Sequence, residues 1–367
     1  MPVLKKIVVR DFRNIALQEL DFSPNVNCIY GSNGVGKTNL MDAIYYLSMT
    51  KSAFNSSDKV NFRYGQESFA IAGTYAMPGG LDVRFSVQVE NGGEKKVRRD
   101  EKVYQKVSDH IGVLPVVMVS PSDSALVSES GEERRRFVNA ILSQLDREYL
   151  DAVSQYNRIL AQRNRYLKGN YIDEMLLDAF DERLSALSEP VFRARAALAE
   201  DLERAVGVYY SRISGGKETV AIAYHSDLQK APLAQLLRES RERDRFLHYT
   251  TCGLQRDDFI FSMNGYPIRK YGSQGQQKSF LVALKFSQYD LMNERYGYAP
   301  ILLLDDLLDK LDLDRIANLL AIVAGNDFGQ IFLSDCNKNR LSALVDRITS
   351  ERCYFEAEGG AFRPTDG

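Results

Sequence analysis

The pattern of apolar and polar positions divides the chain into three parts with different expected structures. Short stretches of the N-terminal part alternate between apolar and polar residues or are bounded by turn residues, as β-strands are. The expected strands are VLKKIVV, IALQELDF, NVNCIY, FAIAGTYAM and LDVRFSVQVE. Pro78-Gly79-Gly80 joins the last two and Asn91-Gly92-Gly93 closes them, which predicts antiparallel hairpins. Residues 1–115 are therefore expected to be rich in β-structure.

The middle of the chain has the periodicity of amphipathic helices, with apolar residues every three or four positions. One long helix is predicted over residues 132–168 and a second over residues 177–209. Pro190 lies inside the second pattern, so a kink or a break is expected there. Because the short polar link Gly169-Asn170 joins the two helices, we expect an antiparallel hairpin that projects from the body.

The C-terminal part returns to alternating strands and helices. FIFSM and YPIRK flank Asn264-Gly265, a strong hairpin signal. A helix is predicted from Gly275 to Glu294, followed by the strand ILLLDD, a helix near residues 313–323 and the strand QIFLSD. This order predicts a parallel sheet. The expected fold is α/β, with a mixed sheet and an antiparallel N-terminal sheet: residues 1–120 and 246–367 form one body, and residues 121–245 form an inserted helical arm.

Composition narrows the functional classes only slightly. A hydrophobic content of 44% and a charged content of 26% are ordinary for a soluble globular protein. The net charge of −2 gives no overall attraction to nucleic acid, so such binding would need local patches. The four cysteines are far apart, which indicates reduced thiols and neither a disulfide framework nor a zinc site. Since MPVLKKIVVRDF lacks the features of a signal peptide and no apolar run approaches a membrane span, a cytoplasmic protein without a membrane segment is expected.

The strongest chemical motif follows the third predicted strand. Gly31-Ser32-Asn33-Gly34-Val35-Gly36-Lys37-Thr38 matches the phosphate-binding loop G-x-x-x-x-G-K-[ST] at every position and opens a predicted helix. Its glycines let backbone amides face phosphates, and the helix N-terminus adds partial positive charge. Lys37 is expected to reach the β- and γ-phosphates of ATP, and Thr38 to ligate Mg²⁺. A glycine-rich loop that merely precedes a helix is the alternative.

Two carboxylates end the apolar strand ILLLDD, as in a Walker B motif. Asp305 is expected to hold Mg²⁺, because hard cations prefer oxygen ligands. Asp306 is expected to be catalytic and to orient or deprotonate the attacking water. Taken alone, the pair could be helix-capping aspartates after a core strand. A complete phosphate-binding loop upstream favours the functional interpretation.

The segment Tyr271-Gly272-Ser273-Gln274-Gly275-Gln276-Gln277-Lys278 opens a long predicted helix. Ser273 and Gln276 have the spacing of a capping box, so a plain helix start is one interpretation. The other is a second anion site, because a polar first turn flanked by glycines lets a phosphate approach the helix N-terminus. Lys37 already supplies one phosphate site within the chain. The second site therefore predicts a dimer with ATP between the loop of one subunit and Ser273 of the other, the arrangement of ABC ATPases.

In combination, these motifs resemble the RecF family of bacterial recombination mediator ATPases, which is related to SMC proteins. The resemblance covers nearly the whole chain and rests on the following segments: Asp11-Phe12-Arg13-Asn14, GSNGVGKTNLMDAIYYLS, Ser120-Pro121-Ser122-Asp123, Glu133-Arg134-Arg135-Arg136-Phe137, Gly253-Leu254-Gln255-Arg256-Asp257-Asp258, Asn264-Gly265, YGSQGQQKSFLVALK and ILLLDDLLDKLD. It implies an ABC/SMC-type P-loop ATPase head formed by both chain ends. It also implies a weak, DNA-dependent ATPase with ATP and Mg²⁺ as cofactors.

The resemblance also implies roles for individual residues. Arg13 and Asn14 would approach the nucleotide, although an exposed strand turn is an equal alternative. Ser273, Gly275 and Gln276 would act across the dimer, with Ser273 taking part in catalysis beside Lys37 and Asp306. Asp309-Lys310-Leu311-Asp312 would be the D-loop, with Asp312 near the nucleotide, and Asp123 would lie in the Q-loop region.

Members of the RecF family bind DNA as ATP-dependent homodimers and cooperate with RecR and RecO in loading RecA at single-strand gaps. The implied setting is therefore DNA replication and repair, including the SOS response to DNA damage. Three positions depart from the family pattern. Gln255 replaces a histidine, Asp309 replaces a serine, and Ser334-Asp335-Cys336 offers no histidine at the switch position.

Two basic segments are candidates for a DNA-binding surface. The first predicted helix carries Arg134, Arg135, Arg136, Arg158, Arg163, Arg165 and Lys168, and a predicted hairpin carries Lys95, Lys96, Arg98, Arg99 and Lys102. Contacts with phosphates would give sequence-independent, salt-sensitive affinity. The alternative is that the basic helix faces the acidic second helix, which is rich in Asp and Glu.

Three other functions fit part of the pattern. The nucleotide-binding domain of a transporter would be expected to have an LSGGQ-type signature, a Glu after Walker B and a switch histidine, and this sequence has none of them. A nuclease-associated SMC-like ATPase would need an additional nuclease domain. A protein that binds ATP without turning it over would be separated by a steady-state ATPase assay.

Overall fold

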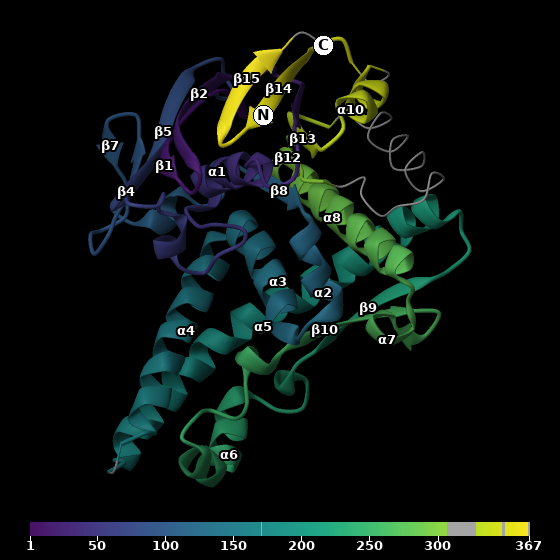
Figure 1. The fold of residues 1–367 in the computed structure, drawn as a ribbon. Coiled ribbons are helices and arrows are strands. Elements are labelled where there is room, and N and C mark those ends of the chain that lie inside the picture. Colours follow the sequence, from purple (N-terminus) through teal and green to yellow (C-terminus); the bar gives the residue numbers. More distant parts are fainter. Residues whose placement is uncertain (170, 307–327, 347–348, 366–367) are drawn as a thin grey trace. The chain divides into compact units, whose positions relative to one another are not determined.

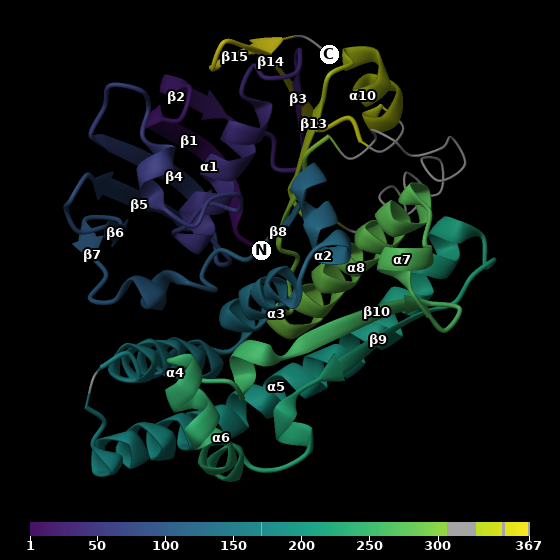
Figure 2. The same cartoon turned by 60° about the horizontal axis from the view of Figure 1, so that its bottom comes forward.

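The computed structural model describes residues 1–169, 171–306, 328–346 and 349–365, shown in Figures 1 and 2. These residues form two compact units. Unit 1 consists of Met1–Asp123 and Lys285–Gly367, and unit 2 of Ser124–Leu284. Unit 2 thus continues past residue 245, where the sequence predicts the return to the first body. The reason is strand pairing: the hairpin strand Asp258–Met263 pairs with Val220–His225, so it stays with the helical segment.

The first sheet of unit 1 is antiparallel, as the hairpin turns predict, with the order β2-β1-β4-β5-β6-β7. Its strands are β1 (Val3–Phe12), β2 (Ile15–Asp21), β4 (Ser68–Ala76), β5 (Asp82–Glu90), β6 (Lys96–Arg99) and β7 (Lys102–Val103). Buried residues alternate with more exposed ones in β4 and β5. One face of this sheet therefore supplies core residues.

The second sheet of unit 1 is mixed, with the order β15-β14-β3-β13-β12-β8. Its strands are β3 (Val26–Tyr30), β8 (Val116–Val119), β12 (Ile301–Leu304), β13 (Ile331–Asp335), β14 (Arg352–Glu358) and β15 (Ala361–Thr365). All pairs are parallel except β14 with β15. Every residue of β8, β12 and β13 is buried, as expected for parallel strands covered on both faces. The predicted parallel sheet is confirmed, but the sequence pattern did not single out β8 or the β14–β15 hairpin.

Helix α1 (Lys37–Met49) joins the two sheets of unit 1. It contacts β1, β4 and β5 of the antiparallel sheet and β8 and β13 of the mixed sheet. Its central residues are buried as a result, which fixes the position of the phosphate-binding loop at its start. Other helical segments that the structure describes in unit 1 are η1 (Asp58–Asn61), η2 (Val107–His110) and α10 (Lys338–Val345), and η3 (Pro121–Ser124) lies at its boundary with unit 2. The helix predicted near residues 313–323 lies outside the described residues.

Unit 2 combines helices with a small antiparallel sheet of order β11-β10-β9. Its elements are α2 (Ala125–Ser128), α3 (Gly131–Leu145), α4 (Arg147–Tyr166), α5 (Glu174–Ser214), β9 (Val220–His225), η4 (Asp227–Gln229), α6 (Leu233–Leu247), η5 (Leu254–Arg256), β10 (Asp258–Met263), β11 (Tyr266–Pro267) and α7 (Ile268–Tyr271). Helices α3 and α5 pack against the sheet, and α4 and α6 pack against α5. Helix α8 (Gln274–Tyr296) begins in unit 2 and ends in unit 1. In the described part of the chain, no helix is both long and apolar enough to span a membrane.

The single helix predicted over residues 132–168 is wrong, because the structure divides it at Asp146. This residue has extended backbone angles and ends α3. Its carboxylate accepts hydrogen bonds from the backbone N–H groups of Glu148 and Tyr149, so it also caps the start of α4. Because the apolar periodicity continues across the break, the sequence pattern does not reveal it.

Helix α5 is continuous from Glu174 to Ser214, so the predicted interruption at Pro190 does not break it. Proline removes one backbone hydrogen bond and disfavours the preceding turn. Leu184 and Val191, on either side of Pro190, are fully buried. Packing along both halves of the helix thus outweighs the local preference to end it.

Arg163 of α4 is a charged side chain buried in unit 2, with none of its surface exposed. It donates hydrogen bonds to Asp181 of α5, Asp244 of α6 and the hydroxyl of Thr250, at 2.7–2.8 Å. Asp244 also accepts hydrogen bonds from the N–H and hydroxyl of Thr251. A buried charge is tolerated when it is paired and hydrogen-bonded, as Arg163 is with two carboxylates. The cluster therefore clamps α4, α5 and α6 together.

Replacing Arg163 by Met should lower the free energy of unfolding by about 3–5 kcal/mol, because Asp244 would stay buried without its cation. Arg158→Met, on the exposed side of the same helix, is the matched control and should change stability by less than about 0.5 kcal/mol. Urea titration followed by circular dichroism measures both variants. Equal midpoints for the two variants would contradict the clamp.

Candidate nucleotide-binding site

The loop between β3 and α1 offers a row of free backbone donors. Gly34 and Gly36 have φ angles of 82° and 114°, in the region that favours glycine. In the described part of the chain, no hydrogen bond is donated by the backbone N–H groups of residues 32–36. The ammonium group of Lys37 lies over the loop and donates to the carbonyl oxygens of Gly31 and Ser32, at 2.7 and 3.1 Å. Free amides, a helix N-terminus and a nearby cation together form an anion site.

Two distant segments hold this loop in place from outside. The carbonyl oxygen of Val35 accepts hydrogen bonds from the N–H of Gly360, at 2.8 Å, and from the Asn14 side-chain amide, at 3.0 Å. The approach is so close that a Cβ on Gly36 would lie 2.7 Å from the Asn14 amide. A Cβ on Gly31 would lie 2.4 Å from the Ala357 carbonyl oxygen. The β14–β15 hairpin and the β1–β2 turn therefore help to set the loop conformation.

Thr38 and Asp305 are brought together, as expected for a shared metal site. The Thr38 hydroxyl donates to one carboxylate oxygen of Asp305 at 2.7 Å, and the Ser334 hydroxyl donates to the other at 2.5 Å. Asp305 is only 1% exposed. Hydroxyl and carboxylate oxygens side by side are the ligands that Mg²⁺ prefers. The residues present therefore fit a magnesium ion next to the phosphate-binding loop.

Asp306 is held in a left-handed backbone conformation, with φ of 43°. Its N–H donates to the Ser334 hydroxyl at 3.1 Å, so one serine contacts both residues of the Walker B pair. Asp306 is partly exposed whereas Asp305 is buried. Ser334, which lies in the segment that offers no switch histidine, is thus part of the site. This role could not be predicted from the sequence, because β13 reaches β12 only in the folded sheet.

Arg13 lies beside α1 and is not an exposed turn residue. Its guanidinium donates to Asp42 at 2.5 Å, to Asn39 at 2.9 Å and to Ser52 at 2.9 Å. Burial raises the pKa of the Asp42 carboxyl, and the positive charge of Arg13 opposes this shift. Asn39 also donates to the Asn14 side chain at 2.7 Å. Both residues are therefore held against the start of α1, and their contact with a nucleotide stays a prediction.

Asp123 follows β8, the strand that pairs with β12. Its carboxylate forms an ion pair with Lys285 at 2.8 Å and accepts a hydrogen bond from the N–H of Ser120 at 2.7 Å. Lys285 also donates to the carbonyl oxygen of Met118. The Q-loop role proposed for Asp123 stays a prediction, and its carboxylate already has a cationic partner.

The expected signature segment belongs to unit 2 and has the geometry of a capping box. The N–H of Ser273 donates to the side chain of Gln276 at 2.7 Å, and the N–H of Gln276 donates to the Ser273 hydroxyl at 3.2 Å. The Gln276 amide also donates to Glu218 at 2.8 Å. Ser273 itself is exposed, and Gly275 follows in the first turn of α8. The capping interpretation is thus realised, and it leaves Ser273 accessible for a contact with a second subunit.

Two departures from the family pattern have different outcomes. Gln255 accepts a hydrogen bond from the Tyr156 hydroxyl at 2.9 Å and donates to the Cys252 carbonyl oxygen at 2.6 Å. It therefore holds the turn before β10 against α4. The predicted D-loop, including Asp309 and Asp312, lies outside the described residues.

Several of the basic residues named as candidates for DNA contact are already paired. Arg134 is buried and forms an ion pair with Asp258, and Arg135 donates to the carbonyl oxygen of Asp257. Arg136 pairs with Glu132 and Glu133 of the same helix. In unit 1, Lys95 pairs with Asp58 and donates to Thr50, whereas Lys96 and Lys102 are exposed. Arg134 and Arg135 are thus engaged within unit 2, whereas Arg136 is exposed, and the DNA contact of this cluster stays a prediction.

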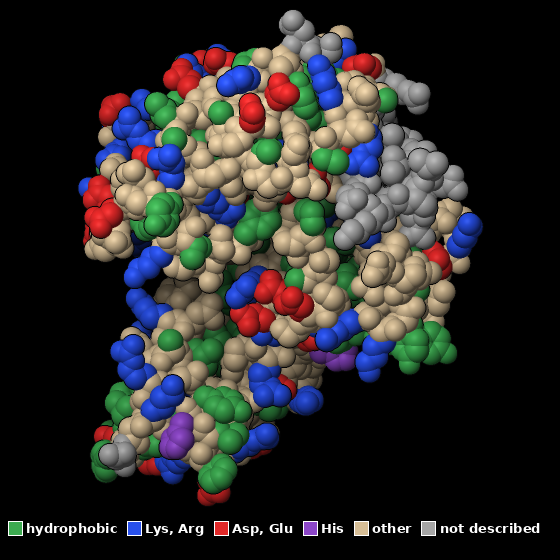
Figure 3. Space-filling model, in the orientation of Figure 1, with side chains coloured by type: hydrophobic (Ala, Val, Ile, Leu, Met, Phe, Trp, Pro, Cys, Tyr) green, Lys and Arg blue, Asp and Glu red, His purple; other side chains and the backbone are tan. Residues whose placement is uncertain are grey.

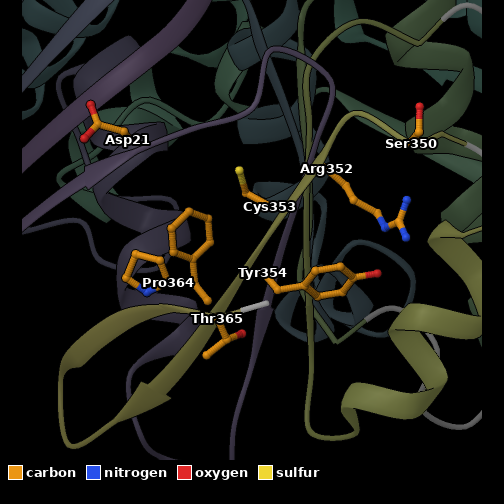
Figure 4. A pocket seen from close by; sticks show the side chains of 8 residues that line it. Asp21, Ser350, Arg352, Cys353, Tyr354, Pro364 and Thr365 are labelled. Atoms are coloured by element: carbon orange, nitrogen blue, oxygen red, sulfur yellow. The ribbon is translucent and has the colours of Figure 1, made fainter. Parts of the chain in front are cut away.

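A separate pocket of about 350 Å³ lies on unit 1 next to the β14–β15 hairpin, as Figure 4 shows. Its lining includes Arg352, Cys353, Tyr354 and Pro364, and the described lining contains no residue of the phosphate-binding loop. Arg352 is already paired with Asp346 at 2.9 Å. The pocket is thus distinct from the nucleotide site.

Known proteins resemble this chain in sequence and in fold. A family model described as the RecF/RecN/SMC N-terminal domain matches residues 3–350. The DNA replication and repair protein RecF of Bacteroides fragilis is 41% identical over 360 residues, which are 98% of this chain and 97% of the relative. The protein of the same name from Parabacteroides distasonis is 41% identical over 364 residues, 99% of this chain and 100% of the relative.

Solved structures agree with these relatives. A structure of the recombination mediator protein RecF with ATP, in the RecFOR pathway, has a TM-score of 0.90 and 29% identity and covers 100% of this chain and 98% of its own. An Smc head domain from Pyrococcus furiosus has a TM-score of 0.58 and 14% identity, with 100% and 96% coverage, so it shares the fold. The predicted ABC/SMC-type P-loop ATPase fold is confirmed. The chain belongs to the RecF family of the RecF/RecN/SMC group of ATPases.

Proposed function

We propose that this protein is an ATP-dependent DNA-binding protein of recombinational repair and replication-gap processing. It dimerises around ATP on DNA, and slow hydrolysis of ATP releases the dimer. The single observation that carries the proposal is the contact of Thr38 with Asp305 at 2.7 Å, beside a loop whose backbone amides donate no hydrogen bond among the described residues. Such an arrangement suits a nucleoside triphosphate with a divalent cation. The ATP-bound RecF structure supports the same nucleotide.

Each residue of the site has a distinct task in this proposal. The amides of residues 32–36 and the ammonium of Lys37 bind the phosphates. Thr38 and Asp305 would hold Mg²⁺, which supplies positive charge that offsets the charge developing on the phosphates. Asp306 orients the attacking water and accepts its proton, and Ser334 keeps the two aspartates in register. Because Asp is one methylene shorter than Glu, slow turnover is expected.

The dimer is proposed from the exposed start of α8. Ser273, Gly275 and Gln276 would contact the nucleotide held by the partner subunit, since a helix N-terminus attracts phosphate. Asp312 would approach the same nucleotide as part of the D-loop. ATP binding would thereby control the association of two subunits on DNA. The unit formed by both chain ends would act as the ATPase head, and the inserted unit would act as the arm, with the bounds that the structure gives in place of 121–245.

The proposed partners are DNA with single-strand gaps or junctions, RecR and RecO, and through them RecA. The relatives support this setting, because they are DNA replication and repair proteins and the ATP-bound structure belongs to the RecFOR pathway. A cytoplasmic location in the response to DNA damage completes the proposal. It accords with four cysteines that are all unpaired thiols.

Gly360→Ala should weaken ATP binding about tenfold, although the residue lies far from the loop in the sequence. A Cβ at this position would lie 2.3 Å from the Asn14 carbonyl oxygen, so the hydrogen bond that holds Val35 would be displaced, which costs about 1–1.5 kcal/mol. Gly359→Ala is the matched control, because Gly359 also has positive φ but its Cβ would meet no atom within 4 Å. Equilibrium titration with a fluorescent ATP analogue measures both, and equal affinities would contradict the role of the hairpin.

Ser273→Arg should abolish ATP-dependent dimerisation and leave ATP binding by the monomer intact, because Lys37 and Thr38 are unchanged. Ser273→Ala removes the helix cap, at a cost of about 1 kcal/mol, without adding bulk. The alanine variant should therefore still dimerise. Light scattering with and without ATP decides between them. If Ser273→Arg still forms a normal ATP-dependent dimer, the proposed ATP site between two subunits is contradicted.

Asp306→Asn should lower single-turnover ATP hydrolysis roughly 100-fold, because the side chain keeps its size and loses its basicity. ATP binding should persist, so the dimer and its complex with gapped DNA should last longer than those of the unaltered protein. Asp305→Asn should instead weaken the ATP-bound state itself. The measurement pairs hydrolysis with the rate of dissociation from gapped DNA, with and without ATP. Lost hydrolysis without a longer-lived complex would break the proposed coupling, and ATP-independent binding of DNA would overturn the proposed function.

A further inference from the structure

One stretch of unit 2 is basic and entirely free of acidic residues. Residues 152–172 contain no Asp or Glu and include Arg158, Arg163, Arg165 and Lys168. They cover most of α4 and the turn that follows it. Charge of one sign over such a length is unusual for a helix that merely faces solvent, where both signs normally mix.

The structure separates these four cations into two kinds. Arg163 is fully buried and bound to Asp181 and Asp244. The other three are exposed. Among the described residues, neither an ion pair nor a hydrogen bond of their side chains occurs for Arg158, Arg165 or Lys168. Three positive charges therefore remain available on the outer face of α4.

The acidic residues of the neighbouring helix do not neutralise them. From the sequence alone, the basic helix could simply face the acidic α5. In the structure, Glu174 and Asp178 at the start of α5 pair with Arg241 of α6, and Glu174 also contacts Arg245. Helix α6 thus supplies the cations for these acids. Within the part of the chain that the structure describes, the acids at the start of α5 therefore pair with α6 and leave Arg158, Arg165 and Lys168 without an ionic partner.

The free cations lie along a single strip. Arg158 and Arg165 are seven positions apart, hence two helical turns and about 10 Å along one face of α4. Lys168 follows in the turn after the helix. The exposed residues around them include Ser154, Gln155 and Gln162, which are uncharged hydrogen-bonding groups. Figure 3 shows basic side chains over the region of α4.

We propose that this strip of Arg158, Arg165 and Lys168 binds the phosphate backbone of nucleic acid, a surface that rests on the proposed DNA-binding function. Guanidinium and ammonium groups spaced along a helix suit a regular row of phosphates, and neighbouring amides and hydroxyls add neutral donors. Such contacts carry no base preference. The strip therefore contributes affinity and salt dependence and leaves the choice of DNA structure to other parts of the protein.

The test compares two triple variants with the same loss of charge. Arg158→Gln, Arg165→Gln and Lys168→Gln together remove the strip. Arg147→Gln, Arg193→Gln and Arg204→Gln remove three arginines that are exposed but ion-paired within their own helices. DNA affinity of the full-length protein is measured with ATP over a range of salt concentrations. Each phosphate contact contributes about 0.9 to the magnitude of the slope of log K against log salt. In the strip variant, the magnitude of this slope should therefore fall by up to about 2.7 per bound subunit.

The control variant should keep the slope and affinity of the unaltered protein. Equal slopes for the two triple variants would contradict the binding of nucleic acid by the strip. The proposed function would still stand, provided the unaltered protein binds DNA with ATP. If the unaltered protein does not bind DNA, both proposals fail. An unchanged DNA slope together with lost binding to an acidic protein would assign the strip to a protein partner and overturn its role here. Unchanged urea midpoints and ATP affinity confirm that both variants are folded.

Discussion

The buried carboxylate of Asp305 is the constraint on which the nucleotide site depends. It accepts hydrogen bonds from Thr38, at the start of α1, and from Ser334, near the end of β13. This contact is possible because β3, β13 and β12 are parallel neighbours, so their carboxyl ends meet at one edge of the sheet. Ligand sites of parallel α/β sheets lie at this edge. Without this shared carboxylate, the phosphate-binding loop, the metal ligands and Asp306 would lose the contact that holds them together.

A second constraint is the close approach of three backbone segments at the loop. Val35 receives hydrogen bonds from the β1–β2 turn and from the β14–β15 hairpin, which lie near opposite ends of the chain. Gly31, Gly36 and Gly360 each occupy a place where a Cβ would collide with a neighbouring segment. The phosphate-binding loop is therefore part of a junction of both chain ends. Changes in the hairpin should reach the nucleotide through this junction.

The arginines of unit 2 fall into two groups: some stabilise the fold through buried ion pairs, and others stay on the surface. Arg134 and Arg163 are bound to buried or half-buried aspartates, and breaking such pairs is costly. Arg158 and Arg165, on the same predicted helix, stay on the surface. Counting basic residues along the helix could not distinguish these groups, because their partners come from α5, α6 and β10. Only partner assignment shows which cations can meet a ligand from outside.

The sequence by itself determined the features that depend on neighbouring residues. The match at residues 31–38, the hairpin at Asn264-Gly265, the alternation of the first strands and the resemblance to RecF all follow from short-range patterns. The break at Asp146, the continuity of α5 through Pro190 and the partners of Arg13 and Ser334 were decided by tertiary structure. In each of these cases, residues distant in the sequence supply the packing or the hydrogen bond. Local preferences amount to about 1 kcal/mol or a few, and such contacts outweigh them. The fold family could therefore be predicted from the sequence, whereas the pairing of the charged residues could not.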